Sequence, residues 1–423
     1  MIAEFRANLL ENFPELLEAK ILLAVSGGLD SVMLTYLMQQ AGLNISIAHC
    51  NFKLRAEESD LDAHFVDDLA NSLKTPLYSK EFNTSEIASE EKTSIQITAR
   101  NIRYRWFEQL KDQEGFDYLV TAHHLDDSLE TFMINFSRGT GIDGLLGIPA
   151  KQNWVRRPLL PFSRKQIEQC AVQHEIEWRE DSSNASDKYV RNKIRHQIIP
   201  KLKEINPSLA QSFEMTLGHL THTKELADAY IENQKSKLSH IHKTHKDLRI
   251  FDLNQILTIP SLEPLLYGLF NPYGFHNTLD LLNLCEAQSG KFLENSKFRL
   301  VKDRQTLILQ DKSKTKPTSI PKIEYDALKQ ENALQIEIPK YLLNADLTVR
   351  KWQNGDYFYP AGFHGKKKLS AYFRDEKLSI IEKERVWILC CGDDLVWVIG
   401  LRRDKRYIGE SKDKNIRRIT IHL

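Results

Sequence analysis

The sequence predicts an α/β protein that begins with a doubly wound parallel sheet and continues into a helical middle domain and a small mixed α/β C-terminal domain. Two observations predict this architecture. Short apolar runs alternate with longer helical segments as far as residue 136, which is the pattern of βαβ units around a parallel sheet. A chain of 423 residues is also long enough for two to four domains, at least one with a full core.

The elements of the N-terminal domain follow from this alternation. Strands are expected where apolar residues run together, and helices where they recur every three or four positions. The expected strands are residues 21–25, 45–50, 77–82 and 118–122. The expected helices are residues 1–20, 32–41, 57–73, 93–109 and 126–136.

The domain limits are predicted from shifts in composition. We place the N-terminal α/β domain at residues 1–205 and the helical middle domain at residues 206–311. Residues 312–322 contain two prolines and no aromatic residue, which is typical of a linker. Residues 323–423 then form the C-terminal domain.

Composition excludes several classes of protein. Residues are 41% hydrophobic and 27% charged, and no segment has the roughly 20 apolar residues of a membrane span. The first twenty residues are acidic and amphipathic, so no signal peptide is expected. Five cysteines without a C-x-x-C pair argue against a zinc ribbon or a disulfide scaffold. We therefore expect a cytoplasmic protein that does not enter the membrane.

Charge is distributed unevenly along the chain. The net charge is only +1, but residues 350–423 carry 17 Lys and Arg against 10 Asp and Glu, a net charge of +7. Aromatic residues lie between these basic residues, a combination that suits RNA because bases stack on rings while phosphates pair with cations. Most of these rings are nevertheless expected in the core. The basic residues singled out for RNA binding are Lys366, Lys367, Lys368, Arg374, Arg402 and Arg403.

The first strand leads into a glycine turn and a helix start, with the sequence Ser26-Gly27-Gly28-Leu29-Asp30-Ser31. Glycines permit close approach to the backbone, and a helix N-terminus attracts anions, so this turn is expected to hold the phosphates of a nucleotide. Asp30 would repel a bare phosphate, which predicts a bound Mg²⁺ between the two. The alternative is an ordinary Gly-Gly turn with a serine cap.

Other polar residues follow the ends of neighbouring strands. His49 ends the second strand, and His123, Asp126 and Asp127 follow the fourth. Ligands of doubly wound sheets bind beyond the carboxyl ends of the strands. His124 lies between His123 and these aspartates, so one crevice is expected to contain the glycine turn, imidazoles and three or more carboxylates.

Three further sequence patterns each allow a functional and a plainer interpretation. Arg191 and Arg195 are spaced i, i+4, so one helical face is electropositive and suits either a phosphate or plain solvation. The G-x-G-x-x-G of residues 139–147 follows a helix rather than a strand, so it indicates a loop and not a dinucleotide fingerprint. The histidines at 240, 242 and 245 have no acidic or cysteine partner at helical spacing and are expected to be solvated.

Taken together, these motifs resemble the PP-loop (N-type) ATP pyrophosphatases and, within them, the tRNA(Ile)-lysidine synthetase family. The glycine turn SGGLDS (26–31) alone matches only the superfamily, whereas the ordered set of motifs is specific for this family. The matching segments are LAVSGGLDSVML (23–34), AHCNFKLR (48–55), TAHHLDDSLETF (121–132), RGTGIDGLLGI (138–148), RPLL (157–160), WREDSSNASDKYVRNKIR (178–195), NGDYFYPAGFHGKKKLSAYF (354–373) and RVWILCCGDDLVWVIGLRRDKRY (385–407). The family's usual D-D-Q is Asp126-Asp127-Ser128 here, so position 128 has a hydroxyl in place of the usual side-chain amide.

The resemblance implies an RNA-modifying ligase. Lysine would be joined to C2 of the wobble cytidine of a CAU-anticodon tRNA(Ile), through an adenylated cytidine, with AMP and diphosphate released. This changes the codon read from AUG to AUA. ATP, L-lysine, this tRNA and Mg²⁺ are the implied ligands. Residues 1–205 would be catalytic, and the two later domains would contact tRNA.

The roles implied for individual residues are as follows. ATP would be bound by Ser26, Gly27, Gly28, Leu29, Asp30, Ser31, His49 and His123, and Mg²⁺ by Asp30 with Asp126 or Asp127. Glu130 would orient the lysine ammonium or take its proton. Arg191 and Arg195 would contact the α-phosphate or the tRNA backbone.

Two alternatives stay open from sequence. One is another PP-loop enzyme such as a tRNA thiolase, which is disfavoured because the chain has no C-x-x-C. The other is a non-catalytic RNA-binding protein, suggested by the basic C-terminal region. For the oligomeric state, a homodimer is one option.

Overall fold

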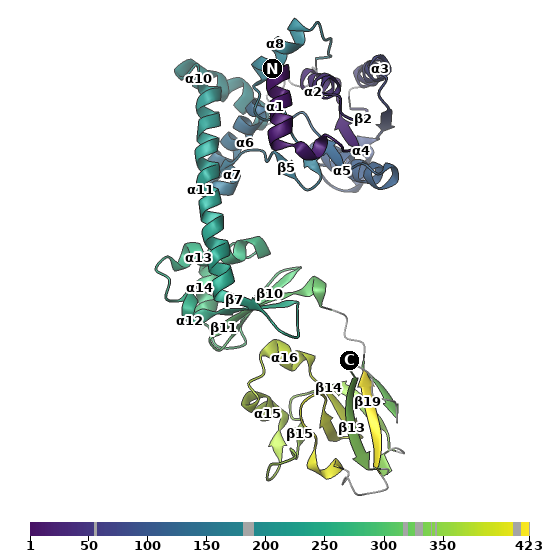
Figure 1. The fold of residues 1–423 in the computed structure, drawn as a ribbon, viewed down its shortest axis with the longest axis vertical. Helices are drawn as coiled ribbons and strands as arrows, with labels where there is room; N and C mark the ends of the chain where they lie inside the picture. Colours follow the sequence, from purple (N-terminus) through teal and green to yellow (C-terminus); the bar gives the residue numbers. More distant parts are fainter. Residues whose placement is uncertain are drawn as a thin grey trace. The chain divides into compact units, whose positions relative to one another are not determined.

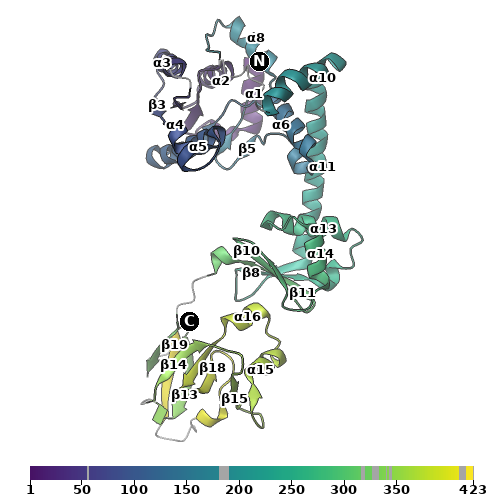
Figure 2. The same ribbon diagram turned by 180° about the vertical axis from the view of Figure 1, so that it is seen from behind.

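The computed structural model describes residues 1–54, 57–180, 190–315, 320–325, 333–339, 341–342, 345–408 and 416–422. Contacts divide the chain into two compact units, Met1–Ala227 and Asp228–Leu423, which are described separately (Figure 1, Figure 2). The division falls within one long helix, α11 (Leu209–Leu238). The finer domain limits given above stay a prediction.

The first unit is built on a six-stranded sheet with the order β3-β2-β1-β4-β6-β5. Four neighbouring pairs are parallel, and β5 runs antiparallel to β6 at one edge. This confirms the predicted doubly wound sheet. The strands are β1 (Ile21–Ala24), β2 (Ile45–Asn51), β3 (Leu77–Glu81), β4 (Tyr118–Val120), β5 (Lys151–Gln152) and β6 (Val155–Arg156).

Helices cover both faces of this sheet. Ile21 and Leu23 of β1 pack into a core formed with α1, α2, α3 and α8, whereas Leu22 packs on the other face against Trp106 and Phe107 of α5. Burial on both faces explains why β1 reads as a continuous apolar run. The helices are α1 (Ile2–Asn12), α2 (Leu29–Gln40), α3 (Glu57–Ser72), α4 (Thr84–Glu90), α5 (Ile95–Glu114), α6 (Leu125–Arg138), α7 (Ile142–Leu145), α8 (Arg164–Gln173), α9 (Val190–Lys193) and α10 (Ile199–Ile205).

The middle region is helical, as predicted, and it also contains an antiparallel sheet. The helices are α11, α12 (Leu253–Ile256), α13 (Leu262–Phe270) and α14 (Thr278–Glu286). The sheet has the order β7-β8-β11-β10-β9. Its strands are β7 (Ser239–Ile241), β8 (Leu248–Asp252), β9 (Phe292–Glu294), β10 (Phe298–Asp303) and β11 (Thr306–Asp311). Helices and sheet share one core, which includes Phe251, Phe270 and Leu300.

The C-terminal region is a mixed α/β module, in agreement with the prediction. Two three-stranded sheets, β12-β19-β13 and β14-β17-β18, accompany a short β15–β16 hairpin. The elements are β12 (Lys322–Tyr325), β13 (Ala333–Pro339), β14 (Leu347–Lys351), β15 (Tyr357–Phe358), β16 (Lys367–Lys368), α15 (Leu369–Asp375), α16 (Ile380–Arg385), β17 (Trp387–Cys391), β18 (Asp394–Val398) and β19 (Ile416–His422).

Aromatic residues of this module divide into core and surface. Phe358, Phe373 and Trp387 are buried, whereas Tyr357 and Phe363 are exposed. Most of these rings thus serve the core, as expected, whereas Tyr357 and Phe363 lie at the surface. Within the part of the chain that the structure describes, no helix is both long and apolar enough to cross a membrane.

Candidate active site

The glycine turn lies where β1 ends and α2 begins. Gly27 has φ +92°, a conformation that residues with a Cβ rarely adopt, and it lets the chain turn directly into the helix. The Ser26 N–H donates to Oγ of Ser31 at 3.2 Å, and this hydroxyl donates in turn to the Gly28 carbonyl at 2.9 Å. Ser31 therefore closes the turn on itself, and the loop is built before any ligand arrives.

A cavity of about 610 Å³ opens beside this turn. Ser26, Gly28, Leu29, Asp30 and Ser31 line one side of it. The ends of β2 and β4 supply further lining residues, including Cys50 and His123. Arg100, Arg103, Arg164, Arg179 and Arg191 also line it, together with Phe52, Tyr104 and Trp178. A cavity lined by a glycine turn at a helix start, several arginines and aromatic rings suits a nucleotide.

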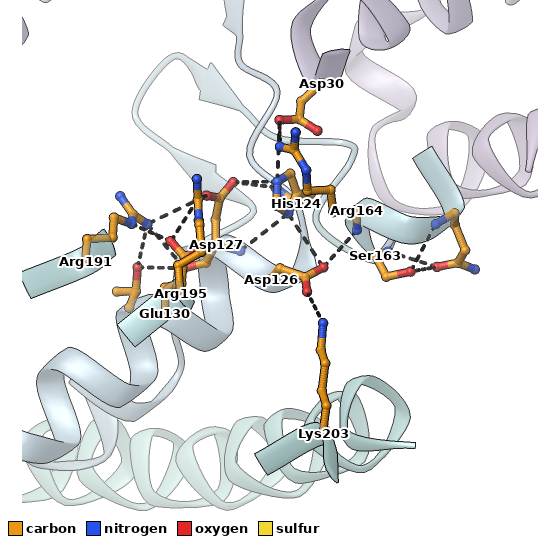
Figure 3. Close-up of polar contacts among 12 residues, drawn as sticks. Asp30, His124, Asp126, Asp127, Glu130, Ser163, Arg164, Arg191, Arg195 and Lys203 are labelled. Atoms are coloured by element: carbon orange, nitrogen blue, oxygen red, sulfur yellow. Dashed lines mark hydrogen bonds and ion pairs between the residues drawn. The ribbon is translucent and has the colours of Figure 1, made fainter. Parts of the chain in front are cut away.

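His124 lies at the centre of the acidic residues (Figure 3). Its Nε2 is 3.6 Å from Oδ2 of Asp30 and 3.5 Å from Oδ2 of Asp127, and its Nδ1 is 3.9 Å from Oδ2 of Asp126. Burial opposes protonation of this imidazole, but the hydrogen bond to Asp30 and the nearby carboxylates outweigh it and raise the His124 pKa. The sequence places His124 beside His123 in the predicted crevice but assigns ATP binding only to His123.

Asp30 is the acidic residue best placed to meet a cation. Oδ2 accepts a hydrogen bond from Nη1 of Arg164 at 3.0 Å, while Oδ1 is buried and has no hydrogen-bond partner among the described residues. Burial favours the neutral carboxyl, yet His124 and Arg164 lower the Asp30 pKa overall, so the group is ionised. Its unpaired oxygen fits a divalent cation.

Asp127 and Asp126 face different surroundings. Asp127 lines the cavity, and its Oδ2 accepts from the backbone N–H of His124 at 3.1 Å. Asp126 is not among the lining residues, and its two oxygens accept from the Arg164 backbone N–H at 2.8 Å and from Lys203 Nζ at 3.1 Å. Of the two predicted alternatives for the second Mg²⁺ carboxylate, the geometry favours Asp127.

No group of three acidic, histidine or cysteine side chains among the described residues could hold a metal ion unaided. Mg²⁺ is usually bound by one or two carboxylates together with water and substrate phosphates. Asp30 and Asp127, beside a turn whose backbone suits phosphate, would form such a donor set.

Glu130 is buried and paired with two arginines (Figure 3). Arg191 Nε donates to it at 2.7 Å, and Arg195 Nη2 donates to it at 3.1 Å. Arg195 also donates to Oδ1 of Asp127 at 3.4 Å. In this arrangement Glu130 holds two guanidinium groups beside the cavity instead of presenting a free carboxylate, so its predicted role as a base would require these pairs to open.

The two histidines predicted to bind ATP occupy different positions. His49 is buried, is not among the cavity-lining residues, and bonds through Nδ1 to the carbonyl of Val25 at 2.9 Å. It supports the end of β1. His123 lines the cavity, and burial lowers its pKa to about 4, so its ring is neutral at physiological pH.

In the second unit, part of the predicted RNA-binding set surrounds the exposed rings of Tyr357 and Phe363. Lys366 Nζ lies 3.3 Å from the ring centroid of Tyr357, and Lys367 and Arg402 lie over Phe363 at 4.9 and 5.3 Å. Lys368 and Arg374 are exposed, and Arg403 forms a β-bridge with Trp397. We call Tyr357, Phe363, Lys366, Lys367 and Arg402 the basic aromatic surface.

The parallel sheet, the glycine turn at the end of β1 and the acidic crevice define a PP-loop ATPase domain, and a family model of the PP-loop domain matches residues 1–202. Models of the TilS substrate binding domain and the TilS substrate C-terminal domain match residues 244–312 and 347–421. The chain belongs to the tRNA(Ile)-lysidine synthase family.

Individual relatives support this assignment over nearly the whole chain. The tRNA(Ile)-lysidine synthase of Bacteroides thetaiotaomicron is 38% identical over 94% of each chain, and that of Parabacteroides distasonis is 36% identical over 94% of each. Among solved structures, the U34-tRNA thiolase NcsA from Methanococcus maripaludis aligns with 52% of this chain and 79% of its own. Its TM-score of 0.42 and 19% identity are too low to bear on function.

Proposed function

We propose that this chain is a tRNA(Ile)-lysidine synthase, which joins L-lysine to C2 of the wobble cytidine of the CAU-anticodon tRNA(Ile). The main support is that models of three domains of this family match the chain in order. A cavity large enough for a nucleotide lies at the glycine turn of the first domain. The thiolase alternative is not favoured, because the relatives and the two TilS domains point to lysidine formation.

The proposed reaction has two steps. The 2-oxo oxygen of cytidine attacks the α-phosphorus of ATP, and the bond to the bridging oxygen breaks to release diphosphate. The neutral ε-amine of lysine then attacks C2, AMP leaves with that oxygen, and the amine loses a proton. Charge builds up on phosphate oxygens in both steps, so fixed N–H groups and guanidinium groups accelerate them.

The residues of the cavity can be assigned roles in these two steps. The backbone of the Ser26–Ser31 turn would hold the β- and γ-phosphates. Asp30 and Asp127 would hold Mg²⁺, which when bound neutralises phosphate charge. Arg191 lines the cavity, and together with Arg195 it would meet the α-phosphate or the lysine carboxylate when either group displaces Glu130.

The remaining expectations belong to the same proposal. The enzyme would act in the cytoplasm, where tRNA and ATP are present. The basic aromatic surface, which is not part of the cavity, would bind the tRNA. A homodimer would appear in sedimentation as a species of twice the 49.1 kDa chain mass.

The test is incorporation of labelled lysine into CAU-anticodon tRNA(Ile), with elongator tRNA(Met) as a parallel substrate. We expect label in tRNA(Ile) only, with one AMP and one diphosphate released for each lysine incorporated. Release of AMP without lysine incorporation, or sulfur transfer in place of lysine, would overturn the proposal.

A further inference from the structure

Arg164 is a cationic residue of the cavity that the proposed reaction does not yet use. It is the first residue of α8, and its guanidinium lines the same cavity as the glycine turn. Nη1 donates to Oδ2 of Asp30 at 3.0 Å, which joins positions 134 residues apart in sequence (Figure 3).

The backbone of Arg164 is held firmly while its side chain is not. Ser163 and Gln166 form a capping box at the start of α8, and the Arg164 N–H donates to Oδ2 of Asp126 at 2.8 Å. The side chain itself is 45% exposed. The start of the helix is therefore fixed, and only the guanidinium can change partner.

The present partner of this guanidinium is easily replaced. An ion pair this exposed contributes little to stability, about 1 kcal/mol or less. Nε2 of His124 lies 3.6 Å from the same oxygen of Asp30, so Asp30 keeps this neighbour when Arg164 leaves. Phosphate oxygens match the planar fork of a guanidinium and can bind it through two parallel hydrogen bonds.

We propose that Arg164 exchanges Asp30 for the β- and γ-phosphates of ATP and remains with the diphosphate as it leaves. In the adenylation step, the electron pair of the broken phosphorus–oxygen bond passes to the bridging oxygen of the diphosphate. A guanidinium at that position stabilises the added charge without a proton transfer. This assignment rests on the proposed function, because it concerns the same ATP cavity.

A positioning role is the alternative, in which Arg164 acts only by holding Asp30. The two roles differ once Asp30 can no longer form the ion pair. If Arg164 touches phosphate, its removal weakens diphosphate binding even in an Asp30→Asn background. If it only holds Asp30, its removal has no further effect there.

The experiment measures binding of inorganic diphosphate and of ATP by calorimetry, with Mg²⁺ and without lysine or tRNA. The full-length variants are Arg164→Ala, Asp30→Asn, the double variant and Lys165→Ala. Substitution at 164 removes the guanidinium with its alkyl chain and keeps the backbone N–H that binds Asp126. Lys165 is an exposed cation on the same helical turn and controls for loss of charge.

We expect Arg164→Ala to raise the Kd for diphosphate about tenfold or more, in both the wild-type and the Asp30→Asn background. Lys165→Ala should leave the Kd unchanged. An unchanged Kd in Arg164→Ala, or no added effect in the Asp30→Asn background, would overturn the proposal. Because these measurements need no acceptor, a wild-type protein that binds diphosphate but incorporates no lysine would refute the proposed function and not this assignment.

Discussion

At the scale of single residues, three aspartates of similar appearance in the sequence have different surroundings in the fold. Asp30 and Asp127 line the cavity, whereas Asp126 ties α6 to α8 and α10 through Arg164 and Lys203. Loss of charge should therefore have different consequences at Asp30 and at Asp126.

Asp30→Asn is expected to reduce the rate of AMP formation by at least about 100-fold, because an amide binds a divalent cation far more weakly than a carboxylate does. Asp126→Asn should reduce it much less and should lower the free energy of unfolding by about 1 kcal/mol, through loss of the charge-assisted bond from Lys203. Single-turnover AMP release and urea unfolding measure the two effects. Equal rate losses in both variants would contradict this division.

Glu130 offers a second prediction, because its two arginines depend on it. In Glu130→Gln the amide cannot pair with both guanidinium groups, so lysine transfer is expected to fall about 100-fold while the Kd for ATP changes little. Lysine incorporation into previously adenylated tRNA, compared with ATP calorimetry, separates the two steps. A large loss of ATP affinity with normal transfer would instead place Glu130 in nucleotide binding.

The sequence predicts the Ser26–Ser31 turn well, but it does not predict which cations pair with the aspartates of the site. Glycines and an apolar strand predict the Ser26–Ser31 turn locally. The contacts of Arg164 with Asp30 and of Lys203 with Asp126 join positions 134 and 77 residues apart, and no local pattern marks either cation. The choice between His123 and His124 likewise depends on which way each ring points at the end of β4.

At the scale of elements, prediction succeeded where apolar residues run together and failed where charged residues interrupt the strands. The strands around β1 are marked by apolar runs, and they were placed to within a few residues. The sheet of the middle region was not predicted, because β10 and β11 have mixed faces and carry charged residues such as Lys302 and Asp311 within the strands. Strand β8, which pairs with β11, ends more than 50 residues before β11 begins. No local sequence pattern therefore indicates that the two strands pair.

Helix α16 is joined to the middle region by an ion pair between Arg385 and Asp247, which is largely buried. Burial favours the neutral carboxyl, but the hydrogen bonds and charge of Arg385 lower the Asp247 pKa overall. A depressed carboxyl pKa contributes stability above its unfolded value near 4 and loses it as pH falls through the folded value.

Asp247→Asn should therefore lower the free energy of unfolding by about 2 kcal/mol at pH 7, because Arg385 loses its partner. The difference from wild type should shrink as pH falls below about 4. Urea unfolding at several pH values measures this. Glu384→Gln, which breaks a more exposed pair with Arg299, is a matched control and should cost less than about 1 kcal/mol. A difference that stays constant with pH would contradict the assignment to charge.

At the scale of the whole molecule, ATP chemistry and RNA binding are assigned to different units of the chain. The triple variant Lys366→Ala/Lys367→Ala/Lys368→Ala is expected to weaken tRNA binding and to reduce the slope of log K against log salt by about 2 to 3. ATP binding should be unchanged. The control removes three exposed lysines of the first unit, Lys80, Lys165 and Lys201. An unchanged salt slope in the first variant would mean that its lysines are only solvated.

The cavity wall has one further property that follows from Cys50 on β2. This side chain lines the cavity, and burial raises the pKa of its thiol to about 12 despite the opposing charges of Arg103 and Lys80. Attack on peroxides and alkylating agents requires the thiolate, which is almost absent near pH 7 at such a pKa. An ATP cavity that contains a cysteine should therefore withstand oxidants and electrophiles that inactivate enzymes with ionised thiols.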